Sequence, residues 1–264
     1  MATAAAIRPV TLGTSYYLNL FAKETRYEFL KALRNRMFSL ATLGFPVMFY
    51  LLFGITNRHA GPGFNYAQYL VAGYSCFGMI AAALFNLGAG ISAERAQGWL
   101  EVKQASPMPR AAYLGAKVLT CMAFGVVIVA VLMTLGLTLG GVHATPLQIA
   151  HLAGIIVIGS IPFASLGLLL SLIMPPNAAP GVINLIYLPM SFCSGLWMPI
   201  EVLPHWLQKT AVVLPTYHYA QLALNVFGYA RSGATLIHWE ALAGFTCLML
   251  GAAWLIFSRS ETQN

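Results

Sequence analysis

Few residues of this 264-residue chain have side chains that could do chemistry. Its six histidines and four cysteines are the candidate metal ligands and nucleophiles. The cysteines all lie in apolar stretches, where the expected role is that of a small buried hydrophobic residue. Neither a phosphate-binding G-x-x-x-x-G-K-[ST] loop nor an H-E-x-x-H zinc motif occurs. The sequence therefore predicts no metal site, and no ATP or other cofactor held by this chain.

One short segment could mark a nucleophile. Residues 192–195 read Phe-Cys-Ser-Gly, which is similar to a fragment of an intramembrane serine-protease motif. The glycine that should precede this fragment is missing, and the sequence does not place a histidine beside Ser194. A membrane enzyme that uses Ser194 stays as the less favoured alternative.

The composition is that of an integral membrane protein. Hydrophobic residues make up 59% of the chain and charged residues 8%, whereas soluble domains carry about 25% charged residues. Such a chain cannot cover a water-facing surface, which excludes a soluble enzyme, a disordered protein and a nucleic-acid-binding domain. All seven acidic residues are glutamates, which excludes an Asp-rich metal cluster.

Apolar stretches organise the chain into membrane spans of about 20 residues each. Residues 118–200 contain no charged side chain, and Gly- and Pro-rich segments at 140–146 and 174–177 divide this run into three parts. We therefore expect one all-α transmembrane domain over residues 1–264. Its six spans are expected near residues 38–55, 67–91, 113–139, 148–173, 178–198 and 237–257.

The distribution of basic residues predicts the orientation. Most of the 14 lysines and arginines precede the first span or lie between the second and third spans, and Arg259 follows the last one. Because cytoplasmic loops carry the excess of basic residues, both termini are expected in the cytoplasm, with the protein in the inner (plasma) membrane. No ionisable residue is expected deep in a span, which disfavours an ion-coupled carrier.

Residues 199–236 are too apolar for an ordinary loop, yet they contain Glu201 and prolines at positions 199, 204 and 215. A charge at the bilayer centre costs about 2.5–3.5 kcal/mol, so a full span is unfavourable here. Two short helices, about 202–213 and 216–228, that dip into the outer leaflet fit better. A seventh span is the alternative.

An amphipathic helix is expected over residues 18–36. Its cations Lys23, Arg26, Lys31 and Arg34 should face lipid phosphates while the apolar stripe faces the membrane. The helix would act as an anchor alone, or would also pass force into the first span. The stripe consists of Leu18, Phe21, Ala22, Thr25, Phe29, Ala32 and Leu33.

A second helix is expected in the loop at residues 92–104. Ser92 can cap its start, and Glu94 suits the positive end of the helix. Trp99 and Leu100 on a charged helix indicate a protein docking site. The alternative is a solvated loop with Trp99 on the bilayer surface.

Four stretches, in this order, resemble the membrane subunits of type-2 ABC transporters, in particular the drug- and antibiotic-resistance branch. The first is the helix before the first span together with Phe45-Pro46. Residues 91–110 are similar to the family pattern E-R-x-x-G-x-L-E…P-x-x-R, although Trp99 stands where many members have a small or polar residue. Residues 194–204 resemble S-G-x-x-x-P-x-x-x-L-P, and residues 214–220 resemble P-x-x-Y/H.

The resemblance implies a separately encoded P-loop ATPase, which binds ATP and Mg, and a second permease copy, either identical (a homodimer) or paralogous. Residues 92–104 would be the coupling helix, and the helix at 18–36 would also touch the ATPase. The expected ATPase-docking residues are Glu94, Arg95, Gly98, Trp99, Leu100 and Glu101.

The resemblance also implies a transport path between two copies. Residues 199–230 would be re-entrant helices at the outer exit, with Pro199, Glu201, Pro204 and Pro215. The expected function is export of an amphiphilic drug, antibiotic or lipid by alternating access. A lipid-linked or cell-surface polysaccharide is the alternative cargo, and a sensor that moves no cargo is a third class. The substrate path is expected at Phe85, Asn86, Tyr187, Phe192 and Trp197.

Overall fold

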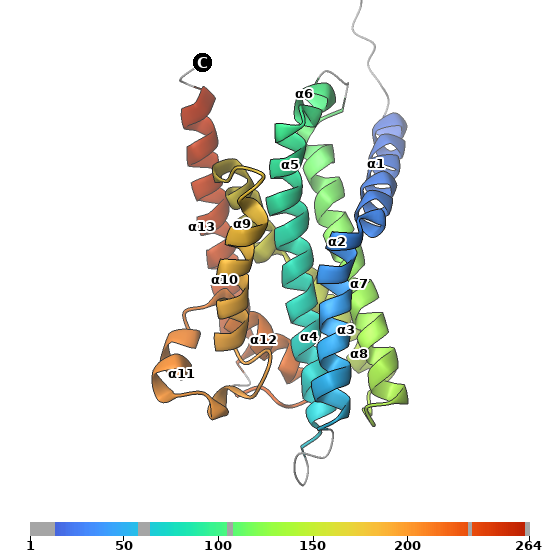
Figure 1. The fold of residues 1–264 in the computed structure, drawn as a ribbon, viewed down its shortest axis with the longest axis vertical. Helices are drawn as coiled ribbons and strands as arrows, with labels where there is room; N and C mark the ends of the chain where they lie inside the picture. Colours follow the sequence, from blue (N-terminus) through green and yellow to red (C-terminus); the bar gives the residue numbers. More distant parts are fainter. Residues whose placement is uncertain (1–13, 58–63, 105–107, 232–233, 262–264) are drawn as a thin grey trace, which may run out of the picture.

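The computed structural model describes residues 14–57, 64–104, 108–231 and 234–261, which form a bundle of helices (Figure 1). Within these residues, five helices are long and apolar enough to cross a membrane. They coincide with five of the six expected spans. Their bounds are Arg36–Ile55, Tyr66–Ala96, Ala111–Thr138, Pro146–Ile173 and Thr235–Arg259.

The span expected at 178–198 is a shorter helix, α10 (Ala179–Cys193). Its 15 residues extend about 22 Å at 1.5 Å per residue, less than the roughly 30 Å of a bilayer core. Pro189 lies inside it, and the chain turns directly afterwards through Gly195, whose φ is +78°. The count of six spans therefore stays a prediction.

The N-terminal part consists of two helices joined at Asn35. α1 (Thr14–Arg34) ends there, and the Asn35 side chain accepts a hydrogen bond from the Phe38 backbone N–H at 3.3 Å, which caps α2 (Arg36–Ser39). The first long helix continues through η1 (Leu40–Gly44), α3 (Phe45–Phe49) and η2 (Tyr50–Ile55), of which η1 and η2 are π-helical. The cap at Asn35 thus sets the angle between α1 and the first span.

The helix at the centre of the bundle is built from α4 (Tyr66–Ala83), the π-helical η3 (Leu84–Ala89) and α5 (Gly90–Ala96). It is almost completely buried, and it packs against α7 (Arg110–Thr138) and α9 (Ile161–Ile173). By contrast, α13 (Thr235–Glu261) is mostly exposed, as expected of a helix that faces lipid.

The fourth long helix consists of α8 (Pro146–Ile158) and α9, with a bend at residues 159–160. Pro162 at the start of α9 has no backbone N–H and cannot continue the hydrogen bonding of α8. The Ser160 N–H bonds the Val157 carbonyl, and the Ile156 carbonyl accepts a hydrogen bond at 2.7 Å from the Tyr219 hydroxyl of α12 (Pro215–Asn225). This bond fastens α12 to the bend.

Two short helices follow α10, close to the two that the sequence predicts. They are α11 (His205–Ala211) and α12, preceded by the 3-10 turn η4 (Ile200–Val202). Their depth in the membrane stays a prediction. In Figure 1, α1, α6 (Trp99–Gln104) and the C-terminal end of α13 lie at one end of the bundle, and α11 lies at the other. The elements expected on the basic side of the membrane are therefore at one end.

Candidate functional site

The helix expected over residues 92–104 is divided in two, and its first half belongs to the central helix. Residues 90–96 continue that helix as α5, so the expectation that Ser92 caps a new helix is wrong. The Ser92 hydroxyl instead lies 2.9 Å from the Met174 carbonyl, to which it donates a hydrogen bond. The break falls at Gly98, whose φ of +73° is a conformation that glycine adopts without strain. α6 begins at the next residue.

α6 presents a small apolar face. Trp99 is 53% exposed and Val102 is 60% exposed, and their spacing of three residues puts them on the same side of the helix. Leu100 turns the other way and packs against the core. The side chain of Glu101 lies outside the part of the chain that the structure describes. We call Trp99 and Val102 the α6 face.

Arg95 binds within the chain. Its guanidinium donates to the carbonyls of Leu172 and Met174 at 3.2 and 3.0 Å. These carbonyls belong to the C-terminal end of α9, where a cation is favoured by the helix dipole. Arg95 thus ties α5 to α9.

A buried ionic cluster lies beneath α6, where α1, α5, α6 and α7 meet. Its centre is Lys117 of α7, which is 1% exposed. The ammonium nitrogen of Lys117 is 3.0 Å from a carboxylate oxygen of Glu28 and 2.8 Å from one of Glu94. Both glutamates are 5% exposed. Three helices are thus held through one cation.

Two more lysines complete the cluster. Lys31 of α1 pairs with Glu94, and Lys103 of α6 lies 2.7 Å from Glu24 and 3.0 Å from Glu28. The three carboxylates and three ammonium groups balance in charge, and the buried members, Glu28, Glu94 and Lys117, are all paired. We call these residues the ionic cluster: Glu24, Glu28, Lys31, Glu94, Lys103 and Lys117.

The electrostatics of the ionic cluster stabilise its charged form. Burial by itself would raise the pKa of Glu28, but the ammonium groups of Lys117, Lys103 and Lys31 together outweigh burial and hold the pKa below its usual value. Burial would lower the pKa of Lys103, but its hydrogen bonds to Glu24 and Glu28 raise it. The Tyr113 hydroxyl also donates to Glu94. Glu28 and Lys103 therefore remain ionised at neutral pH.

The position of Glu94 differs from the expectation that it meets an ATPase. Its carboxylate is buried and bonded to Lys31, Lys117 and Tyr113, so it supports α5 and α6 from within. Docking through Trp99 and its exposed neighbours stays a prediction. Lys117 and Glu28 are not among the site residues that the sequence predicts. A lysine one or two turns inside an apolar helix was the available signal, because it needs a buried partner.

α1 packs on α7 with the middle of its predicted apolar stripe, where Phe29 contacts Phe124 and Ala32 is buried, and with one residue of its polar side. Leu18 and Leu33 of the predicted apolar stripe are 64% and 45% exposed, while Glu28 of the polar side is buried against α7. Lys31 belongs to the ionic cluster. Lys23, Arg26 and Arg34 are exposed, as expected, and within the described residues they form no ion pair. The buried face of α1 thus includes Glu28, the partner of Lys117, beside the middle of the apolar stripe.

The residues expected along a substrate path fall into two places. Asn86 and Phe85 lie in η3, where the Asn86 amide donates to the Lys117 carbonyl of α7 at 3.3 Å. The other three gather around Trp197, whose ring is 4.5 Å from that of Phe192 between centroids. The Tyr187 hydroxyl donates to the Phe77 carbonyl at 2.9 Å. We call this group the aromatic cluster: Phe49, Tyr74, Phe77, Tyr187, Phe192 and Trp197.

The four residues of the expected re-entrant region lie between α10 and α12. Pro199 and Glu201 border or belong to η4, Pro204 precedes α11, and Pro215 begins α12. The prolines stand where each helical turn starts, a position that proline favours. This spacing explains why the segment forms short helices.

α12 is joined to α13 by a pair of histidines. His218 and His238 approach within 2.8 Å through their Nδ1 atoms, and the His218 Nε2 atom is 2.9 Å from the Val212 carbonyl. Burial lowers the pKa of His218. Within the described residues, no three metal-ligating side chains lie close enough to hold a metal ion. The pair thus serves as a connection between helices.

The hydrogen bonds of Ser194 do not support the hypothesis that it is a catalytic nucleophile. Its hydroxyl donates to the Met190 carbonyl and shares a hydrogen bond with the Thr216 hydroxyl. The nearby His218 is engaged with Val212 and His238. In the described residues, Ser194 therefore holds α10 against α12, and a histidine base does not contact it.

Comparison with known proteins identifies the class. A model of the family described as "ABC-2 type transporter" matches residues 20–227, which is most of the chain. The chain therefore belongs to this family and is a transporter membrane subunit, a multi-pass membrane protein of a kind that works with an ATPase. It is also similar to a protein of Bacillus subtilis (strain 168) named "Putative transport permease YvfS", with 27% identity over 203 residues, or 76% of this chain and 83% of that protein.

Proposed function

We propose that this chain is the permease of an ATP-driven exporter in the plasma membrane, and that a separate ATPase docks on the α6 face. The observation that carries this proposal is the exposure of Trp99 and Val102 on a short helix whose base is fixed by the ionic cluster. Exposed aromatic anchors with rigid support are typical of docking sites. In this arrangement both termini are cytoplasmic, because the start of α1 and the end of α13 lie at the α6 end of the bundle (Figure 1).

The ionic cluster supports a mechanical role for the end of the bundle at which α6 lies. A partner that pushes α6 acts on Lys103, and through Glu28 and Lys117 the displacement reaches α1 and α7. ATP-driven movement at the docking face would thus shift several spans together. Alternating access of two permease copies, identical or paralogous, would follow.

The cargo proposed for this exporter is an amphiphilic small molecule such as a drug, an antibiotic or a lipid. The aromatic cluster supports this class, because stacked rings that reach the surface at Phe192, which is 44% exposed, suit an apolar or aromatic cargo. A polysaccharide would require polar groups in the path. ATPase activity in liposomes, stimulated by hydrophobic cations or by lipid-linked glycans, distinguishes the two cargo classes.

Co-purification tests the docking proposal. The tagged full chain is isolated from its native cell in a mild detergent, and the proteins that remain bound are identified by mass spectrometry. We expect a P-loop ATPase in near-equal amount with the unaltered chain, and its loss with Trp99→Ala. Trp254→Ala is the matched control, because Trp254 is 67% exposed but lies on α13. Retention of the ATPase by Trp99→Ala would refute docking at the α6 face.

A further inference from the structure

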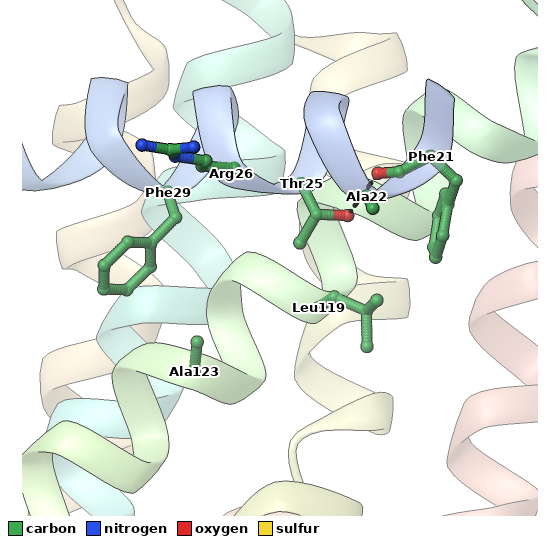
Figure 2. Close-up of a pocket in the computed structure, with 7 residues that line it drawn as sticks. All are labelled: Phe21, Ala22, Thr25, Arg26, Phe29, Leu119 and Ala123. Atoms are coloured by element: carbon green, nitrogen blue, oxygen red, sulfur yellow. Dashed lines mark hydrogen bonds between the residues drawn. The ribbon is translucent and has the colours of Figure 1, made fainter. Parts of the chain in front are cut away.

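A groove runs between α1 and α7, away from the α6 face. Figure 2 shows its lining, with Phe21 and Phe29 at its two ends and the smaller Ala22 and Thr25 between them. The groove has a volume of about 510 Å³. Its lining, which we call the α1 groove, consists of Phe21, Ala22, Thr25, Arg26, Phe29, Leu119 and Ala123.

The packing of α1 on α7 explains why the α1 groove is not filled by side chains. The Phe21 ring rests on Gly115, where a Cβ atom would lie 3.1 Å from the ring. At the other end, the ring centroids of Phe29 and Phe124 are 5.2 Å apart. The two phenylalanines hold the helices apart, and the small side chains between them do not fill the space.

The α1 groove is apolar inside. The polar atom of Thr25 is already used, because its hydroxyl donates to the Phe21 carbonyl at 2.9 Å. The facing residues of α7 are Leu119 and Ala123. A hydrocarbon chain is the ligand that such a lining fits, since it offers a polar ligand few partners.

One cation stands at the groove. Arg26 lines it, is exposed, and forms no ion pair within the described part of the chain. The carboxylates of its own helix, Glu24 and Glu28, are bound to Lys103 and Lys117. The guanidinium of Arg26 is therefore free to bind an anion from outside the chain, and its geometry matches phosphate well.

We propose that the α1 groove binds one anionic phospholipid, with an acyl chain between α1 and α7 and the phosphate on Arg26. A phospholipid combines the apolar chain and the anion that the groove and Arg26 separately require. It is also the abundant partner of an amphipathic basic helix in a membrane. The bound lipid would fill the gap that the two phenylalanines leave and would fix α1 against the bundle.

Native mass spectrometry of the detergent-purified full chain tests this site. The chain is incubated with phosphatidylglycerol or with phosphatidylcholine that carries the same acyl chains. We expect one phosphatidylglycerol retained per chain, and weaker retention of phosphatidylcholine. Arg26→Gln should lower retention about tenfold, the change expected for loss of one charge-assisted hydrogen bond. Ala123→Trp, which fills the groove, should abolish retention.

Two matched controls keep the result specific. Arg34→Gln removes an exposed cation of α1 that does not line the groove, and Val126→Trp adds the same ring at an exposed position of α7 outside it. Both should retain the lipid like the unaltered chain. The proposal is overturned if all four variants retain equal lipid, or if phosphatidylcholine binds as well as phosphatidylglycerol. Arg26→Gln alters an exposed side chain, so it tests the site even if Ala123→Trp fails to fold.

Discussion

Substitution of Lys117 by methionine tests the ionic cluster most directly. Methionine preserves the length of the side chain but removes the ammonium group that lies 3.0 Å from Glu28 and 2.8 Å from Glu94. Both carboxylates then stay buried without their shared cation. Breaking a buried ion pair in this way costs about 3–5 kcal/mol.

The free energy of unfolding that is lost is smaller than the sum for two separate ion pairs, because each carboxylate keeps some of its other partners. Lys31 and the Tyr113 hydroxyl still bind Glu94, and Lys103 still binds Glu28. We therefore expect one loss of about 3–5 kcal/mol. At about 2–4 °C per kcal/mol for a chain of this size, the unfolding midpoint should fall by roughly 6–20 °C.

The assay is thermal unfolding of the purified chain in detergent at neutral pH, followed by loss of monodispersity. Lys23→Met is the control, because Lys23 is an exposed lysine of α1 outside the cluster, and its change should stay within about 0.5 kcal/mol. Adding Glu94→Gln to Lys117→Met should recover part of the loss, since it removes one unpaired charge. An unfolding midpoint of Lys117→Met equal to that of Lys23→Met would refute the assignment.

Three further predictions concern the same fold. Gly98→Ala should cost about 1–2 kcal/mol because alanine is strained at a φ of +73°, and a midpoint unchanged in thermal unfolding would contradict this. Tyr219→Phe removes the 2.7 Å hydrogen bond to the Ile156 carbonyl at the bend and should cost about 1–3 kcal/mol in the same assay; equal stability would mean that another donor replaces it. The pH dependence follows from three shifted groups. Because the pKa of Glu28 is lowered in the folded chain, its contribution to stability is complete above the unfolded pKa of 4.5 and is lost as pH falls through the folded pKa. Because the pKa of Lys103 is raised, its contribution is complete below the unfolded pKa of 10.5 and is lost as pH rises through the folded pKa. The lowered pKa of His218 adds stability that is full above its unfolded value of 6.5 and lost as pH falls below it. The unfolding midpoint should therefore be flat between about 6.5 and 10.5 and fall outside this range, and a steep change inside the range would refute the prediction.

The long helices could be predicted from the sequence because each depends on a local property. A run of apolar residues bounded by Gly and Pro defines its own helix, as the stretch that becomes α8 and α9 illustrates. α10 shows the limit of this rule. Its apolar run continues past residue 193, yet the turn at Gly195 ends the helix early.

The ionic cluster could not be predicted in the same way, because its partners are distant in sequence. Glu28 and Lys117 meet only because α1 lies along α7, and the apolar stripe of an isolated helix does not show that Glu28, on the polar side, is buried as well. The break at Gly98 could not be predicted from the sequence either, because the residue types at positions 90–96 suit the end of one helix as well as the start of another. In both cases the deciding contact belongs to the tertiary structure.

The unbroken central helix has a mechanical consequence. Its 31 residues, Tyr66–Ala96, form a rod about 46 Å long. About two thirds of the way from Tyr66 to Ala96, Asn86 in the π-helical η3 is bonded to α7, which offers a fulcrum. The arm from Asn86 to Ala96 is about 15 Å and the arm to Tyr66 about 30 Å. If the rod tilts about Asn86, a displacement of its Ala96 end, beside α6, becomes about twice as large at its Tyr66 end. A small movement at one membrane surface then produces a larger movement at the other.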